Sequence, residues 1–286
     1  MEMKGAFSVE IPEEAAQWLG ETLGPFEVVG CCRGESSRTG VWKVKSRNGT
    51  HYLKLNGRRV RWATELYVYQ NWATVFTPFA PELQGVLDKG GQVGLLLGAL
   101  EGVPLREVTI APAQEVKTYA MAGELLARLS TCQTGSWFGQ MDEQGRAVSF
   151  AGELLEEPVR DPRSYYRDLI SGSIQGAEAA AALIPYERRI AESVLYSLES
   201  IVFPQPVPTS LDYTPGNWIV DSNGNFRGLI DFENMLWVFP SIPLCDSWST
   251  ISRSIATPRK HSTVATGAEH QRNIATRFVS GASSTH

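Results

Sequence analysis

The feature that most constrains how this chain can fold is a β-hairpin predicted in its second half. Residues 218–221 and 226–230 are short, largely apolar runs that favour strands. Residues 223–225, Asn-Gly-Asn, lie between them and form a turn readily, because Asn and Gly tolerate positive φ. Folding the chain at this turn brings Asn217 and Asp231 to the same open end of the hairpin.

These side chains carry the oxygen atoms that metal-assisted chemistry needs. Asp212 precedes Asn217 by one loop, so a second carboxylate lies near the open end. Carboxylate and amide oxygens suit Mg²⁺, and they also suit phosphoryl transfer, in which one Asp orients a hydroxyl while metal ligands hold the nucleotide. An ordinary hairpin rich in Asp and Asn is the alternative interpretation, since Asp, Asn, Pro and Gly are common turn residues.

The pattern D-x-x-x-x-N, a hairpin, and then I-D-F-E resembles the catalytic segment of the aminoglycoside phosphotransferase and small-molecule kinase family. That family is a branch of the protein-kinase-like fold, and its usual motif is H-G-D-x-x-P-x-N. Asp212, Pro215 and Asn217 match this motif, whereas Ser210 stands where the family has His. The resemblance implies that Asp212 is catalytic and that Asn217 and Asp231 hold Mg²⁺.

A lysine on an earlier strand extends the resemblance. Lys54 lies in the alternating run 50–55, where a kinase-like lobe carries a Lys that reaches the nucleotide phosphates. Glu65 follows in a helix predicted over 59–72, and the resemblance implies that it holds the Lys54 ammonium. The alternatives are a solvated strand lysine and a surface pair between Glu65 and Arg61, four residues earlier.

Two further segments match the nucleotide site of the family. The loop 30–40 is rich in Gly and Ser, and its backbone N–H groups could cradle phosphates, although hairpin loops are commonly of this composition. Residues 95–105 resemble the hinge between the lobes, where backbone groups would meet the adenine. The implied nucleotide-binding residues of these segments are Gly34, Ser36, Ser37, Gly98, Ala99 and Leu100.

The order of predicted elements indicates a two-lobed α+β protein with a kinase-like fold. Strands dominate residues 1–100, which we interpret as a nucleotide-binding lobe. Residues 101–257 read as a helical lobe with the catalytic loop and the acceptor pocket, and residues 258–286 as a polar tail. Within the second lobe, helices are expected at 113–129, 164–173 and 177–198, with an irregular stretch over 135–163.

Composition narrows the function classes. The 286 residues are 43% hydrophobic and 20% charged, which is typical of a globular protein, and the net charge of −5 without a polybasic run argues against nucleic acid as a partner. No apolar run is long enough to span a bilayer. The four cysteines have no C-x-x-C spacing, and with no signal-peptide pattern we expect a cytoplasmic protein with reduced thiols.

The predicted function is transfer of the γ-phosphoryl group of ATP to a hydroxyl of a small molecule, with Mg²⁺ as cofactor. The family resemblance favours an aminoglycoside or related antibiotic as the acceptor. A metabolite kinase of the choline, homoserine or sugar type is one alternative, and a catalytically silent nucleotide-binding pseudokinase is another. GTP as the donor and the oligomeric state both stay open.

Overall fold

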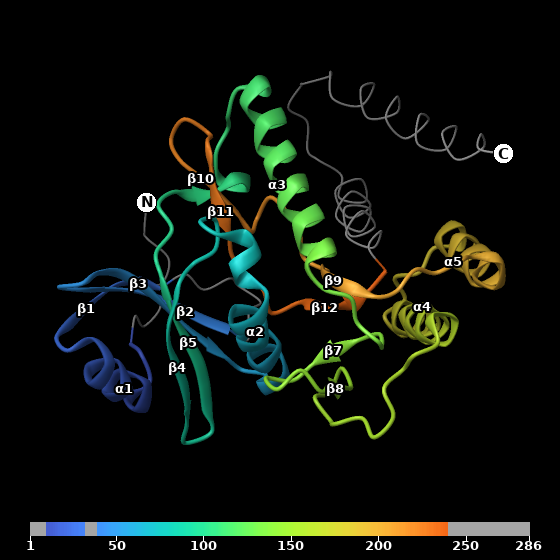
Figure 1. Ribbon diagram of the computed structural model, residues 1–286, viewed down its shortest axis with the longest axis horizontal. Coiled ribbons are helices and arrows are strands. Elements are labelled where there is room, and N and C mark those ends of the chain that lie inside the picture. The colour runs from blue at the N-terminus through green and yellow to red at the C-terminus, as the bar shows by residue number, and fades with distance from the viewer. Residues whose placement is uncertain (1–9, 32–38, 240–286) are drawn as a thin grey trace. The chain divides into compact units, whose positions relative to one another are not determined.

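The computed structural model describes residues 10–31 and 39–239 of the 286-residue chain. Within these residues the fold is α+β: an antiparallel five-stranded sheet is followed by a mainly helical region with three small sheets (Figure 1). The α+β class predicted from the sequence is therefore confirmed. In the part of the chain that is described, no helix is both long and apolar enough to cross a membrane.

The five-stranded sheet positions Lys54 near its centre. Its strands follow the order β1-β2-β3-β5-β4, so β3, which carries Lys54, has a neighbour on each side. All its pairs are antiparallel. The strands are β1 Phe26–Cys31, β2 Thr39–Ser46, β3 Gly49–Asn56, β4 Leu83–Lys89 and β5 Gln92–Gly98.

The hairpin between β2 and β3 fixes which way Lys54 points. Ser46 pairs with Gly49 across a two-residue turn, and Gly49 has a φ of 126°, a value that favours glycine. The Asn48 N–H donates to Ser46 Oγ at 3.1 Å. Because side chains alternate along a strand, this register puts Leu53 on one face of the sheet and Lys54 on the other.

One helix covers each face of this sheet (Figure 1). Helix α1, Glu13–Leu23, buries Ala15 and Leu19 against the face that contains Leu53. Helix α2, Arg59–Asn71, packs on the opposite face, where Lys54 lies. The second helix therefore brings its side chains to the lysine.

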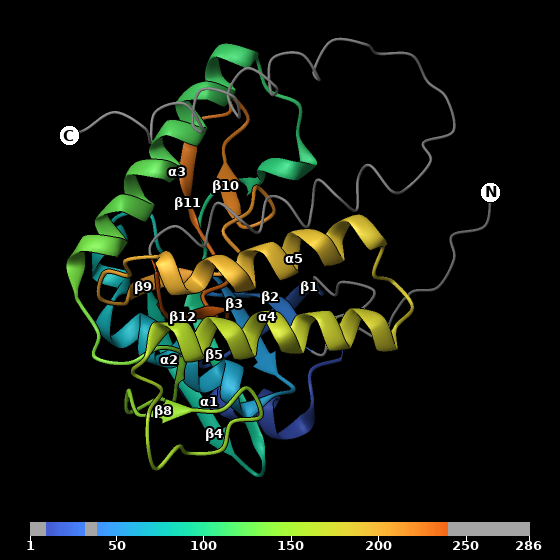
Figure 2. The ribbon, with the colours of Figure 1, turned by 90° about the vertical axis from the view of Figure 1, so that its right-hand side faces the viewer.

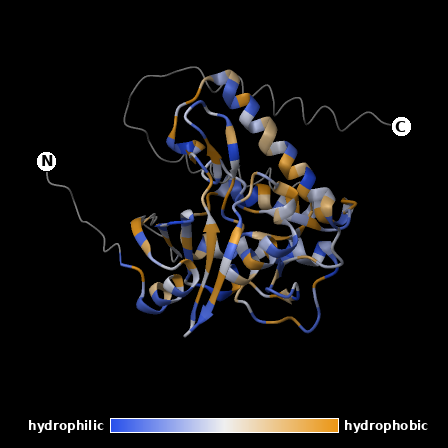
Figure 3. Ribbon diagram, turned by 60° about the vertical axis from the view of Figure 1, so that its left-hand side comes forward, coloured by the Kyte–Doolittle hydropathy of each residue, from blue (hydrophilic) through white to orange (hydrophobic). Residues whose placement is uncertain are grey.

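The remaining helices follow the sheet. Helix α3 confirms the helix expected at 113–129, and it buries Ala122, Leu125 and Leu129 on one face. Figure 3 shows this helix with alternating hydrophobic and hydrophilic colours, as expected for an element that packs on one side only. Helices α4 and α5 lie side by side (Figure 2). The bounds are α3 Pro112–Cys132, α4 Pro162–Ala179 and α5 Pro185–Ser197.

The boundary between α4 and α5 differs from the sequence prediction. We expected a break near 174–176 and a second helix over 177–198, but α4 continues to Ala179 and α5 begins only at Pro185. Proline disfavours a helical conformation in the residue before it, and Ile184 is indeed extended, with φ −86° and ψ 153°. Pro185 therefore sets the start of α5. The sequence prediction followed the helical periodicity and did not take this proline into account.

Three small sheets lie outside the five-stranded sheet, and two of them contain the strands on either side of Asp212 and Asp231. Strand β10 pairs with β11 and with β6, and β9 pairs with β12. The stretch expected to be irregular contains a short hairpin of β7 and β8. The bounds are β6 Val103–Pro104, β7 Gln140–Met141, β8 Ala147–Val148, β9 Val207–Ser210, β10 Trp218–Val220, β11 Phe226–Leu229 and β12 Met235–Val238.

Candidate active site

The predicted hairpin exists and has the expected geometry. Its strands are β10 and β11, in which Trp218 pairs with Leu229. Asp221 closes the turn, because its side-chain Oδ1 accepts the N–H groups of Asn223 and Asn225, both at 2.9 Å. At the open end the Ile230 N–H donates to the Asn217 carbonyl at 3.0 Å. Asn217 is thus hydrogen-bonded to the residue that precedes Asp231, so Asn217 and Asp231 lie at the same end of the hairpin, as the sequence predicted.

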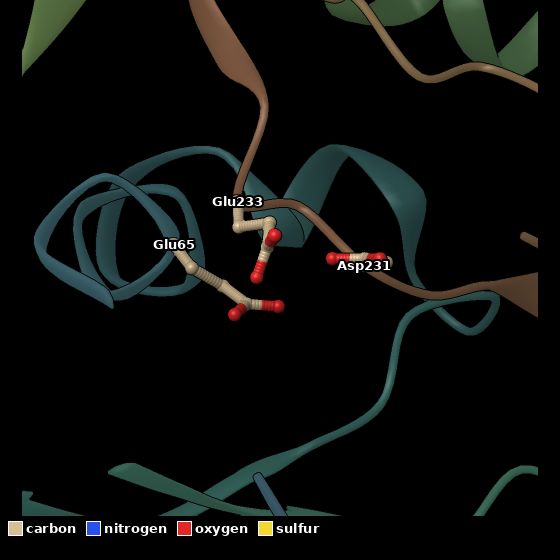
Figure 4. Close-up of side chains that lie close together, drawn as sticks. All are labelled: Glu65, Asp231 and Glu233. Atoms are coloured by element: carbon tan, nitrogen blue, oxygen red, sulfur yellow. The ribbon is translucent and has the colours of Figure 1, made fainter. Parts of the chain in front are cut away.

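The Lys54 ammonium lies among three carboxylates. Its Nζ is 2.7 Å from Asp231 Oδ1, 2.8 Å from Glu65 Oε2 and 3.1 Å from Glu233 Oε2. Figure 4 shows these carboxylates converging from α2 and from the segment after β11. Carboxylate oxygens of the three lie within 4.8 Å of one another, a spacing that could also suit a metal ion. Since Lys54 already fills the space between them, the cation of this cluster is the ammonium.

Burial and charge both act on this cluster. Burial raises the pKa of Glu65 to about 7, although the neighbouring ammonium acts in the opposite direction. Burial by itself would lower the pKa of Lys54, yet Glu65, Asp231 and Glu233 together raise it well above its usual value. Despite burial, Lys54 and Arg61 hold the pKa of Glu233 below its ordinary value. The lysine therefore stays charged.

Glu65 pairs with Lys54 rather than with Arg61. The alternative surface pair between Glu65 and Arg61 does not form, because Arg61 Nη1 instead lies 2.5 Å from Glu233 Oε1. Glu65 also accepts the Phe232 N–H at 3.2 Å through Oε1. Both oxygens of Glu65 are therefore used to join α2 to β3 and to the residue after Asp231.

The loop that carries Asp212 is held together by its own polar groups. Thr214 Oγ1 donates to Asp212 Oδ1 at 3.2 Å, and Asn217 Nδ2 donates to the Asp212 carbonyl at 2.9 Å. The Asp212 N–H donates to Ser210 Oγ at 3.2 Å. Ser210, which stands where the related motif has His, thus binds the loop backbone directly. The bond from Nδ2 also turns Asn217 Oδ1 away from this loop carbonyl.

The hinge residues are only partly available for a nucleotide. The Gly98 N–H donates to the Glu82 carbonyl at 2.8 Å, and the Ala99 N–H donates to the Thr50 carbonyl at 3.3 Å. Within the described part of the chain, no backbone carbonyl accepts the Leu100 N–H. Of the three predicted hinge residues, Leu100 is therefore the one whose N–H has no backbone partner within the described residues, and its contact with an adenine stays a prediction.

The other predicted nucleotide loop cannot be placed in the same way. Gly34, Ser36 and Ser37 lie outside the described residues, as does the C-terminal tail. The strands on both sides of the loop are present, and Cys31 pairs with Trp42. The phosphate-binding role of the loop stays a prediction.

Sequence reasoning missed two residues that the fold brings to the site. Arg61 was considered only as a surface partner, although Glu233 in the I-D-F-E motif could have suggested a second carboxylate for the cluster. Arg106 carried no signal at all. Its N–H donates to the Pro215 carbonyl at 3.3 Å, and its Nη1 would lie 2.9 Å from a Cβ at position 216, so Gly216 leaves room for the guanidinium beside Asn217.

The chain is similar to a family and to several solved structures. A family model described as a phosphotransferase enzyme family matches residues 32–272. No curated protein matches the sequence. The structure of a thermostable mutant of aminoglycoside phosphotransferase APH(4)-Ia, in a ternary complex with AMP-PNP and hygromycin B, is 14% identical with a TM-score of 0.63, over 96% of this chain and 85% of that chain.

Two other structures are similar over most of their length. Aminoglycoside phosphotransferase APH(3'')-Id from Streptomyces rimosus is 15% identical with a TM-score of 0.50, over 96% of this chain and 94% of that one. A provisionally assigned fructosamine-3-kinase from Haemophilus somnus is 16% identical with a TM-score of 0.54, over 80% of this chain and 74% of that one. At such identities the likeness shows the fold, and it confirms the kinase-like architecture. Because the family model spans most of its length, the chain belongs to the phosphotransferase enzyme family.

Proposed function

We propose that the protein transfers the γ-phosphoryl group of ATP to a hydroxyl of a small molecule, with an aminoglycoside or related antibiotic as the first acceptor class to test. The observation that carries this proposal is the buried Lys54 ammonium, 2.8 Å from Glu65 and 2.7 Å from Asp231. A lysine held in this way, beside a carboxylate that solvent can reach, is what nucleotide phosphates and a divalent cation require.

The residues present fit Mg²⁺. Asp231 keeps 34% of its side chain exposed, and only its Oδ1 is used by Lys54. Asn217 donates through Nδ2 to a loop carbonyl, so its Oδ1 is the atom left for a cation. Both are oxygen ligands of the kind that Mg²⁺ prefers. When bound there, the ion would neutralise charge on the phosphates.

The candidate site residues have separate roles in the proposed reaction. Lys54 would bind the nonreacting phosphates, and Glu65 would keep its ammonium aimed at them. Asp212 would orient the acceptor hydroxyl and receive its proton. The hydrogen bond from Thr214 holds its carboxylate, and the bond from its N–H to Ser210 Oγ holds its backbone. Leu100 would offer its N–H to the adenine. Because the transition state is loose, such positioning and charge stabilisation would supply most of the rate acceleration.

The acceptor class rests on the relatives rather than on a pocket of this chain. Two similar structures are aminoglycoside phosphotransferases, one of them bound to hygromycin B. The fructosamine-3-kinase keeps a metabolite acceptor as the second candidate.

We propose the lobe boundary near residue 100 as well, since the chain leaves the five-stranded sheet at Gly98 and β6 then pairs with β10.

The test is ADP release by the purified full-length protein with Mg·ATP and a panel of acceptors. The panel holds aminoglycosides, choline, homoserine, amino sugars and fructosamines, and GTP replaces ATP in a parallel series. We expect turnover with at least one acceptor, and we expect Asp212→Asn and Asp231→Ala to remove it while the proteins stay folded. A folded Asp231→Ala variant with near-normal turnover would refute the assignment. Mg·ATP binding without turnover on any acceptor would favour the pseudokinase alternative.

A further inference from the structure

One ion pair of the cluster has no task in the proposed reaction. Glu233 is 5% exposed and lies between two cations, with Oε2 3.1 Å from Lys54 Nζ and Oε1 2.5 Å from Arg61 Nη1. Phosphoryl transfer requires Lys54 and its partner Glu65, but it does not require Arg61. A buried carboxylate bridging two cations, next to the metal-binding segment, therefore calls for a role of its own.

The backbone beside this ion pair is in an unfavourable conformation. Asp231 has a φ of 68°, in the left-handed region that residues other than glycine rarely adopt. Such a conformation is strained and persists only where the surroundings enforce it. The Ile230 N–H is held by the Asn217 carbonyl on one side, and the Phe232 N–H is held by Glu65 on the other.

Helix α2 supplies two of the contacts that hold this turn. Arg61 and Glu65 are one helical turn apart, so their side chains leave the same face of the helix. Instead of pairing with each other, Glu65 binds the Phe232 N–H and Arg61 binds the Glu233 carboxylate. Lys54 then closes a ring, since it contacts both Glu65 and Glu233. The helix, the central strand and the turn are thus joined pairwise.

We propose that Arg61 and Glu233 are positioning residues, which fix helix α2 to the 231–233 turn and so keep Asp231 in the conformation that presents its carboxylate to Mg²⁺. This proposal rests on the proposed function. If a cation at Asp231 drew this carboxylate away from Lys54, the ammonium would still have Glu65 and Glu233 as partners. The ring then holds the ammonium in place for the phosphates, and the turn does not relax.

The sign of the effect separates positioning from simple electrostatics. Replacing Arg61 by Met removes a cation from the neighbourhood, which through space alone would make Mg²⁺ bind more tightly. If Arg61 positions the turn, the same change makes Mg²⁺ bind more weakly. We expect Arg61→Met to need about tenfold more Mg²⁺, equivalent to about 1.4 kcal/mol, for the half-maximal thermal stabilisation by ATP.

A matched control comes from the same helix. Arg59 forms an exposed bidentate pair with Asp88, at 2.8 and 2.6 Å, on the first turn of α2. Arg59→Met removes a similar side chain and ion pair, so we expect the Mg²⁺ requirement to stay at the wild-type value. Arg61→Lys keeps the charge and should restore most of the affinity, which a role limited to packing would not predict. In turnover, Arg61→Met should raise the KM for Mg·ATP more than it lowers kcat.

The outcomes decide between the two proposals. If Mg·ATP stabilises the wild type and Arg61→Met behaves as Arg59→Met does, the positioning role is wrong and the proposed function stands. Tighter Mg²⁺ binding by Arg61→Met would overturn the positioning role as well. If Mg·ATP does not stabilise the wild type, the proposed function fails and the positioning role fails with it. Should Arg61→Met not fold, Arg61→Gln replaces it, because it also removes the cation and so keeps the opposite signs expected from positioning and from electrostatics.

Discussion

Replacing Lys54 by Met tests whether the ammonium holds the buried cluster together. The Lys54 side chain is 8% exposed and contacts three carboxylates, of which Glu65 is fully buried. Removing one partner of a buried ion pair costs about 3–5 kcal/mol, because the remaining charge is left uncompensated. Methionine is one heavy atom shorter than lysine, so it removes the charge while keeping most of the side-chain volume. For a protein of this size the loss corresponds to a fall in Tm of roughly 6–20 °C.

The stability loss of Lys54→Met should also depend on pH, in a direction that the pKa of Glu65 determines. The pKa of Glu65 is already about 7, above its ordinary value of 4.5, and without Lys54 it will rise further. The folded protein then binds more protons than the unfolded chain in this window, so stability increases as pH falls. The deficit of Lys54→Met relative to wild type should therefore shrink as the pH is lowered towards about 7, where Glu65 takes up its proton in the variant before it does in the wild type, and it should change little on Glu65's account below pH 7.

Urea unfolding at several pH values measures this effect, and a second variant isolates its cause. Lys54→Met combined with Glu65→Gln removes the most deeply buried charge, so we expect it to recover at least half of the lost stability without recovering any turnover. The exposed Arg59–Asp88 pair serves as the reference, since solvent screens it and Arg59→Met should hardly change stability. If Lys54→Met is as stable as wild type at all pH values, the ammonium does not neutralise the cluster and our reasoning is wrong.

Three further predictions concern the support of the site and the cation. Gly102 has a φ of 133°, and a Cβ there would collide with the Val220 carbonyl, so Gly102→Ala should lower the free energy of unfolding by about 1–3 kcal/mol in urea titrations. Thr64 Oγ1 donates to the Met141 carbonyl at 2.8 Å in a buried position; Thr64→Val should cost about 1–3 kcal/mol, whereas Thr64→Ser keeps the bond and should cost less. Chelation of divalent cations with EDTA should remove the thermal stabilisation by ATP, and added Mg²⁺ should restore it; stabilisation that survives EDTA would contradict a metal at Asp231.

Local chemistry determined much of what the sequence predicted correctly. The turn after residue 222 and the turn between β2 and β3 are each specified by Asn and Gly within a few residues, so both hairpins follow from short-range preferences. Alternation in β3 then put Lys54 on the face opposite Leu53. The two helices after α3 were less well predicted, because a periodic pattern marks the existence of a helix better than it marks its ends.

The family motif predicted roles for Asp212, Asn217 and Asp231 that the residues alone could not assign, and these roles stay predictions. Asp212, Asn217 and Asp231 are spaced by a loop and a hairpin, whose geometry depends little on the rest of the molecule. An acidic stretch of the sequence, Glu153, Glu156 and Glu157, has the charge that would attract a cationic acceptor, although a solvated helix end explains it equally well. The structure puts this stretch beside β8, well away from β10 and β11 in both Figure 1 and Figure 2.

The sequence by itself determined the two hairpins, the helix after β3 and the type of residue at each position of the site. Only the tertiary structure decided that Glu65 pairs with Lys54 and that Arg61 pairs with Glu233, which is 172 residues away. Arg61 and Glu65 lie on the same helix face and could have paired with each other. The sequence does not show whether such an i, i+4 pair or a pair with a distant residue forms. The packing of α2 against the turn after β11 determines these pairs, because a buried carboxylate must be paired with a cation and the fold decides which cation is within reach.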